Sequence, residues 1–207
     1  MSSELRKLFE KELQEYFKRN LNLSSNMKVN RNEILIKSTE NNSASGDIGF
    51  RYLNNANGYI LYSGVESPDL NSFFKEKKPP YRSNKPENIV YSMNTSMEIG
   101  FKSFSPGMRG TIDLPRNEEE RKKNCEWIYT KVKDVYLTRV INLIELKSEA
   151  INDVIAHPDY YSYPFLTILY LIKKNALSLD DLNMESILSR KVVGNKSFDK
   201  NLLETYL

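Results

Sequence analysis

The sequence predicts an α+β fold with an N-terminal helix, an antiparallel β-sheet of about five strands and a C-terminal helical layer or subdomain. Changes in the spacing of apolar residues lead to this prediction. Apolar residues recur every three or four positions in residues 1–20, alternate with polar residues from 28 to 114, and return to helical spacing after Pro115. We expect residues 1–115 to form the helix and the sheet. Residues 116–207 should form a helical layer packed on the sheet as one domain.

The first predicted element is an amphipathic helix. Its apolar positions follow helical spacing and consist of Leu5, Leu8, Phe9, Leu13, Tyr16 and Phe17. Ser3 is expected to cap the N-terminus of this helix, and Asn20 is expected to close its C-terminus. The apolar stripe needs a sheet or a second helix to cover it.

The alternating region predicts the sheet. Ile48, Phe50 and Tyr52 share one face of a strand, residues 54–58 supply a turn, and residues 59–62 form the return strand. Further strands are predicted at residues 34–36, 89–91, 97–101 and 110–114. Because no helix carries the chain across within these hairpins, the strands are expected to pair antiparallel.

Residues 66–87 interrupt the sheet pattern. Several prolines in this stretch break regular structure, and residues 75–78 are all charged. We expect a long exposed loop here, with at most one helical turn around Phe73 and Phe74.

The pattern after Pro115 is helical. Asn117 is expected to cap a helix with an acidic first turn, and a polar stripe predicts that this helix continues without interruption from residue 118 to 149. Three further helices are predicted, over residues 165–172 after Pro164, over residues 178–188 with Ser178 as the cap, and after Ser197.

The composition excludes several kinds of catalytic centre. Among 207 residues there is one histidine, His157, and one cysteine, Cys125, so the chain cannot supply the Cys/His cluster that a zinc site requires. No Gly-rich phosphate loop occurs in the sequence. We therefore expect no catalytic residue, no metal and no cofactor. His157 is expected at a helix end and Cys125 in the core.

The charge is nearly balanced, with 30 basic and 27 acidic residues. This balance argues against a dedicated nucleic-acid-binding protein, although it allows a local basic patch. No apolar run approaches the ~20 residues that cross a bilayer, and the N-terminus lacks the apolar core of a signal peptide. Together with the single cysteine, these features predict a cytoplasmic protein without a membrane segment.

Two segments carry the residue types of a binding surface. The first mixes basic and aromatic residues, and its candidate contacts are Lys75, Lys77, Lys78, Tyr81 and Arg82. Such a mixture suits the phosphates and bases of a nucleic acid, and it equally suits an acidic protein surface. The alternative is that Phe73 and Phe74 anchor the loop to the core while its lysines are simply solvated.

The second candidate segment is the connection before Pro164. It contains Tyr160, Tyr161 and Tyr163, and tyrosine is enriched at interface hot spots because it provides a large contact area at a small entropic cost. Packing of these rings over helix ends within the fold is an equally good explanation. If both segments are exposed on one side of the protein, a partner interface is the natural interpretation.

One short motif resembles part of a nuclease centre. Glu145 and Lys147, separated by one residue, are similar to the E-x-K half of restriction-type nucleases, in which a carboxylate holds a divalent metal and a lysine helps to activate water. Asp113 or Asp134 would then be the second metal ligand. This chemistry requires Glu145 and Lys147 on one side of a strand, whereas a helix places them about 200° apart. A solvated helix face is therefore the preferred interpretation.

The preferred function is a non-enzymatic cytoplasmic protein that binds and inhibits another protein, such as a bacterial toxin-immunity protein or a phage-encoded inhibitor of a host system. The small size, the irregular loops and the missing catalytic groups favour it. The abundance of Asn, Lys, Ile and Ser is typical of an AT-rich bacterial or phage genome. A nucleic-acid-binding accessory protein is the alternative, and a divalent-metal nuclease is the least favoured. The sequence leaves the partner's identity and the oligomeric state open.

Overall fold

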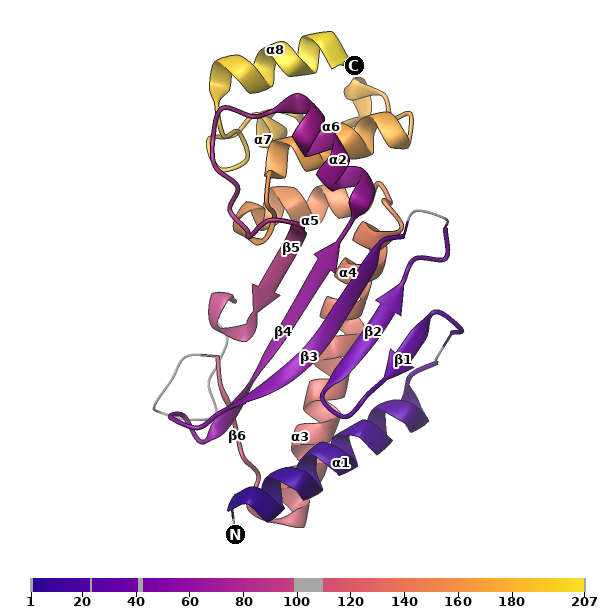
Figure 1. Cartoon of the computed structure of the whole chain (residues 1–207), viewed down its shortest axis with the longest axis vertical. Helices are drawn as coiled ribbons and strands as arrows, with labels where there is room; N and C mark the ends of the chain where they lie inside the picture. Colours follow the sequence, from indigo (N-terminus) through magenta and orange to yellow (C-terminus); the bar gives the residue numbers. More distant parts are fainter. Residues whose placement is uncertain (1, 23, 41–42, 99–109, 207) are drawn as a thin grey trace. The chain divides into compact units, whose positions relative to one another are not determined.

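The computed structural model describes residues 2–22, 24–40, 43–98 and 110–206. Within these residues, six strands form one antiparallel sheet in the order β1-β2-β3-β4-β5, with β6 paired to β4 (Figure 1). The strands are β1 (Met27–Val29), β2 (Glu33–Lys37), β3 (Ser45–Leu53), β4 (Gly58–Glu66), β5 (Ile89–Asn94) and β6 (Ile112–Asp113). The helix α1 (Ser2–Asn20) precedes the sheet, and most other helices follow it. The predicted α+β fold class is confirmed.

The remaining helices are short to medium in length. They are α2 (Pro68–Lys77), α3 (Glu118–Lys131), α4 (Thr138–Ile144), α5 (Ala150–Ala156), α6 (Pro164–Lys174), α7 (Met184–Ile187) and α8 (Lys196–Tyr206). Tighter or wider turns occur at η1 (Thr95–Met97), η2 (Val132–Leu137), η3 (Pro158–Tyr160) and η4 (Leu179–Asp181), of which η2 is a π-helix. Among the described residues, no helix combines the length and the apolar character needed for a membrane crossing.

The chain groups into two compact units. Unit 1 comprises Met1–Lys37, Gly46–Gly64 and Met93–Val140, and unit 2 comprises Ser38–Ser45, Val65–Ser92 and Ile141–Leu207. The expectation that residues 1–115 and 116–207 pack as one domain stays a prediction.

The core of unit 1 forms where α1 meets the strands and α3. Phe9 of α1 is fully buried, and its ring lies edge-on to that of Tyr59 in β4 at 5.4 Å. On the neighbouring face of α1, Glu12 pairs with Arg121 of α3 over 2.8 Å, and the Tyr129 hydroxyl donates to the carbonyl oxygen of Asn20. Figure 1 shows α1 and α3 side by side. Phe9, Leu13 and Phe17 of the predicted apolar stripe are thus buried against a sheet and a helix, whereas Leu8, also predicted in this stripe, is 41% exposed.

Unit 1 also buries an acidic side chain. Glu10, which the helical pattern leaves unexplained, accepts a hydrogen bond from the Tyr59 hydroxyl at 3.2 Å and pairs with Arg31 at 2.8 Å. Arg6 lies within 3.9 Å of the same carboxylate and 4.0 Å above the ring of Tyr52. These partners compensate the cost of burying a charge.

Most of the predicted strands are confirmed. Ile48 and Phe50 are buried and Tyr52 is half-buried on one face of β3, and the turn at residues 54–57 leads into β4 as expected. The short strand β1 has no counterpart in the prediction. The strand predicted at 97–101 begins at Met97, which lies in η1, and its residues 99–101 lie outside the described residues.

The prediction of one uninterrupted helix from 118 to 149 is wrong beyond residue 144. Asn117 does cap α3, since its side chain accepts from the amide of Glu120 at 2.9 Å, and helical structure continues through η2 and α4. The helix then ends in a Schellman motif, in which the amide of Lys147 donates to Asn142 and that of Leu146 to Leu143. Leu146 adopts the left-handed conformation with φ 51°, which glycine usually supplies. Because no glycine is present at this position, the sequence pattern does not indicate that α4 ends here.

The predicted loop at 66–87 contains a regular helix instead. Ser67 caps α2, Pro68 occupies its first turn, and Lys78 closes it in the left-handed conformation. Phe73 and Phe74 are buried, as predicted for anchors of this segment. The prolines around α2 mark its ends, because proline is favoured at the first helical position and shortly after the last.

The C-terminal part of unit 2 is built around α6, whose residues from Pro164 to Leu169 are all buried. Ser178 caps only the short turn η4, and Asn183 starts α7 separately, so the helix predicted over 178–188 is wrong. The last predicted helix exists as α8, but Asn195 rather than Ser197 accepts the capping hydrogen bond, from the amide of Phe198.

Candidate binding site

A hollow with a volume of about 390 Å³ lies within unit 2. It is bordered by the C-terminal half of α2, the segment that follows α2, the start of β5 and the connection before α6. The lining residues are Asn71, Phe74, Lys75, Lys78, Pro79, Ser83, Lys85, Pro86, Glu87, Asn88, Ile89, Ser162 and Tyr163. Both segments that the sequence analysis singled out therefore contribute to one concave surface.

Hydrogen bonds hold the walls of this hollow in place. The amide of Lys78 donates to the carbonyl oxygen of Phe74 at 3.0 Å and ends α2 at the rim. The Ser83 hydroxyl donates to the carbonyl oxygen of Lys85 and accepts from the amide of the same residue. Asn84 donates through its backbone to Ser162 at 2.9 Å and through its side chain to Tyr161 at 3.1 Å. The segment after α2 is thus fastened to the connection before α6.

The lining is predominantly basic. Three lysines and one glutamate give it a formal net charge of +2. Lys75 lies 3.9 Å from Glu87, but both side chains are largely exposed and such a pair contributes little. Burial lowers the pKa of Lys85, against the opposing influence of the Asp159 carboxylate. Neither Lys78 nor Lys85 forms a salt bridge within the described ranges.

One polar group at the wall lacks a partner. Ser162 is only 4% exposed, and its hydroxyl oxygen has no hydrogen-bond partner within the part of the chain that the structure describes. A buried hydroxyl left unpaired costs about 1 to 3 kcal/mol. Its backbone is fully engaged, since the amide donates to Val90 and the carbonyl oxygen accepts from Asn84.

Of the contacts predicted in the basic–aromatic segment, some line the hollow and others do not. Lys75 and Lys78 are exposed at the hollow. Lys77, by contrast, points to the other side of α2, where its ammonium pairs with Glu76 at 2.7 Å and lies 4.5 Å from the centre of the Tyr206 ring. Arg82 is exposed but does not line the hollow. Tyr81 is half-buried, and its ring packs against Tyr163.

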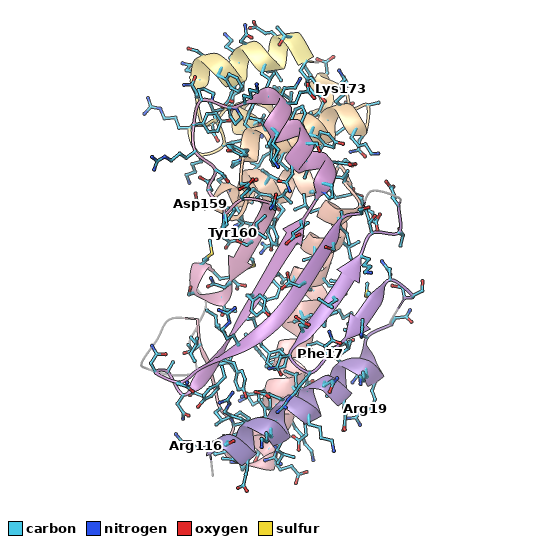
Figure 2. All side chains as sticks on the ribbon, in the orientation of Figure 1. Phe17, Arg19, Arg116, Asp159, Tyr160 and Lys173 are labelled. Atoms are coloured by element: carbon cyan, nitrogen blue, oxygen red, sulfur yellow. The ribbon has the colours of Figure 1, made fainter. Side chains whose placement is uncertain are left out.

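The tyrosine-rich segment divides in the same way. Tyr163 lines the hollow, whereas Tyr160 and Tyr161 are only 6% and 1% exposed. The Tyr160 ring stacks on His157 at 4.9 Å (Tyr160 is labelled in Figure 2), and the Tyr161 hydroxyl donates to Asp153. Tyr160 and Tyr161 therefore serve internal packing, which was the alternative explanation for this segment.

Sequence reasoning left Lys85 and Ser162 out of the candidate contacts. Lys85 belongs to the charged segment, so its residue type was a signal, but its partial burial and the electrostatic influence of Asp159 on its pKa arise only in the folded chain. Nothing in the sequence marks Ser162. It is one serine among three tyrosines, and only the fold places it at the wall.

The nuclease-like motif does not have the geometry that its chemistry requires. Glu145 and Lys147 follow α4 in a turn and not in a strand. The carboxylate of Glu145 accepts hydrogen bonds from the Thr39 amide at 2.7 Å and from the Thr39 and Ser38 hydroxyls at 3.0 Å each. Across the described ranges, no group of three or more His, Cys, Asp or Glu residues is arranged to hold a metal ion.

Cys125 and His157, the single cysteine and the single histidine, both lie where the sequence analysis expected them, one in the core and one at a helix end. Cys125 is buried in α3, and burial raises the pKa of its thiol to about 12. His157 ends α5, as expected, and its imidazole lies 3.9 Å from the Asp153 carboxylate.

Comparison with known proteins does not extend this description. No protein-family model matches the chain, and no curated protein or solved structure is significantly similar to it.

Proposed function

We propose that this chain is a non-enzymatic cytoplasmic protein that binds and inhibits another protein, and that the hollow in unit 2 belongs to its contact surface. Two examples of this class are a bacterial toxin-immunity protein and a phage-encoded inhibitor of a host system. The observation that carries the proposal is the convergence of Lys75, Lys78 and Tyr163, which come from two separate segments, on one hollow.

The same surroundings favour a protein partner over a nucleic acid. Non-specific nucleic-acid binding relies on aromatic rings that are free to stack on bases. Here Phe74 is buried and lies edge-on to Tyr163 at 5.1 Å, and Tyr81 contacts Tyr163 at 5.8 Å. The rings of this segment are therefore occupied with one another, which leaves cationic side chains at the rim for acidic groups of a partner.

The test is co-expression of the chain with the products of its neighbouring genes, followed by size-exclusion chromatography of each pair. We expect one neighbour to elute with it as a stable complex of fixed stoichiometry. The double variant Lys75→Glu/Lys78→Glu should weaken this complex at least about tenfold, as expected for charge reversal at a complementary contact. Lys174→Glu, at an exposed lysine of α6 outside the hollow, is the matched control.

Two outcomes would count against the proposal. The first is that no neighbouring product forms a complex while the chain itself is folded. The second is that the chain instead binds single-stranded oligonucleotides with an affinity that falls steeply with salt, which is the behaviour of the nucleic-acid-binding alternative.

A further inference from the structure

We propose that the hollow binds a carboxylate side chain of an acidic segment in the partner protein, held by the ammonium groups of Lys78 and Lys85 and by the Ser162 hydroxyl. This inference rests on the proposed function and adds the chemistry of the bound group. Three features of the lining support it: two lysines, Lys78 and Lys85, that form no salt bridge among the described residues, an unpaired hydroxyl, and an apolar wall.

Lys85 provides the first argument. Burial lowers the pKa of its ammonium more than the Asp159 carboxylate raises it, and no carboxylate of the described ranges forms a salt bridge with it. A partly buried cation without a paired anion is unfavourable, and an entering carboxylate would compensate it. Lys78 stands at the rim of the same hollow on the last turn of α2, where it adds a second positive charge.

Ser162 provides the second argument. A buried hydroxyl almost always has a hydrogen-bond partner in a folded protein, and this one has none among the described residues. As a donor, it suits an acceptor-only group such as a carboxylate, and the bond to a charged acceptor is stronger than one to a neutral acceptor.

The apolar part of the wall indicates what accompanies the carboxylate. Phe74, Pro79 and Ile89 border the hollow beside the lysines. A volume of about 390 Å³ lies at the lower end of the range of small-molecule pockets. It suits one acidic side chain together with one neighbouring apolar side chain of an extended segment.

A polyphosphate chain fits this surface less well. A nucleic acid gains affinity by neutralising many phosphates along a basic track. Here the lining of the hollow carries a net charge of only +2, and Glu87 within it repels a second phosphate. A nucleic acid is therefore kept as an outcome of the test and not as the proposal.

The experiment uses the whole chain labelled with ¹⁵N and two blocked tetrapeptides, acetyl-Gly-Glu-Phe-Gly-amide and its Gln counterpart. We expect the Glu peptide to shift the amide resonances of Lys78, Lys85 and Ser162 and to bind at least about tenfold more tightly than the Gln peptide. Lys85→Met should reduce the affinity for the Glu peptide to that for the Gln peptide. Lys174→Met, outside the hollow, should leave it unchanged.

Ser162→Ala separates a binding role from a structural one. Removing an unpaired buried hydroxyl should leave the midpoint of urea unfolding unchanged or raise it, while the affinity for the Glu peptide falls several-fold, by about the strength of one charge-assisted hydrogen bond. If the unfolding midpoint falls and the affinity does not, the hydroxyl has a structural role and the inference is overturned for Ser162.

The remaining outcomes are also decisive. Equal binding of the two peptides, or shifts confined to residues outside the hollow, would overturn the inference. So would displacement of the Glu peptide by low concentrations of a thymidine oligonucleotide, which would assign the hollow to phosphate. A complex with a neighbouring gene product that Lys85→Met leaves intact would refute this inference and leave the proposed function standing. Peptide binding without any such complex would refute the proposed function.

Discussion

The hydroxyl of Tyr81 donates a hydrogen bond to the carboxylate of Asp199 at 2.8 Å, and this carboxylate is completely buried. The second carboxylate oxygen accepts from the amides of Gly194 and Asn195 at 2.8 and 3.0 Å. Burial raises the pKa of Asp199, although these hydrogen bonds oppose the shift. The segment after α2 is in this way joined to the beginning of α8.

Replacing Tyr81 by Phe tests this connection. Loss of the hydroxyl leaves one oxygen of a buried carboxylate without its donor, so we expect the free energy of unfolding to fall by about 1 to 3 kcal/mol. Urea denaturation followed by circular dichroism measures the change. Tyr170→Phe is the matched control, because Tyr170 is also half-buried in unit 2 and its hydroxyl forms none of the hydrogen bonds of the described residues. Equal stability of both variants would contradict the prediction.

A second prediction concerns Gly194. A Cβ atom at this position would lie 2.2 Å from Cε2 of the Tyr81 ring, which is well inside van der Waals contact. We expect Gly194→Ala to destabilise the protein by about 1 to 3 kcal/mol, as overpacking does elsewhere. In a Tyr81→Ala background the same substitution should cost much less, because the obstructing ring is absent. If Gly194→Ala destabilises the Tyr81→Ala variant as much as it destabilises the wild type, the clash with the Tyr81 ring is not the cause.

The carboxylate of Glu145 yields a third prediction. Glu145→Gln weakens hydrogen bonds from Thr39 and Ser38 that are made to a charged acceptor, so we expect a loss of about 0.5 to 1.5 kcal/mol in the free energy of unfolding near pH 7. Lys147→Gln, at the exposed partner of the nuclease-like motif, should have little effect. Nuclease activity with magnesium that disappears in both variants would contradict the structural role.

The loss should depend on pH. Burial pushes the pKa of Glu145 upward, but the hydrogen bonds from Thr39 and Ser38 outweigh it and lower the pKa. A carboxyl with a lowered pKa in the folded state adds stability above its unfolded pKa of about 4.3, and this stability is lost as the pH falls through the folded value. The difference in unfolding free energy between wild type and Glu145→Gln should therefore shrink below about pH 4.

A fourth prediction concerns Cys125. Because burial raises the pKa of its thiol to about 12, almost no thiolate is present at pH 8 and the sulfur is shielded from solvent. We expect iodoacetamide to modify Cys125 only as fast as the protein opens, and in denaturant to modify it at the rate of a free thiol. Mass spectrometry of timed samples provides the measurement. Rapid labelling of the folded protein would mean that α3 is more open than described.

Local patterns predicted the elements whose signals are local. The apolar spacing in α1, the alternation in β3 and the Asn117 cap are properties of a few neighbouring residues, and each is confirmed. The prediction of a loop over residues 66–87 failed because proline is common both in loops and at the ends of helices. The prolines around α2 suggested a broken loop, although the same prolines favour the two ends of a helix.

The end of α4 could not be found in this way. Leu146 adopts a conformation that usually identifies glycine, and it is 1% exposed, so contacts with other parts of the fold stabilise a backbone geometry that its own side chain disfavours. That is a tertiary effect, and no window of neighbouring residues contains it.

The candidate site shows the same division. The sequence by itself determined that basic and aromatic residues cluster in two segments, because composition is a local property. Only the tertiary structure decided that Lys78 lines a hollow while its neighbour Lys77 lies against Tyr206, and that Tyr163 is half-exposed while Tyr161 is buried. Whether a side chain is available to a partner depends on what covers it, and the covering residues here come from distant parts of the chain.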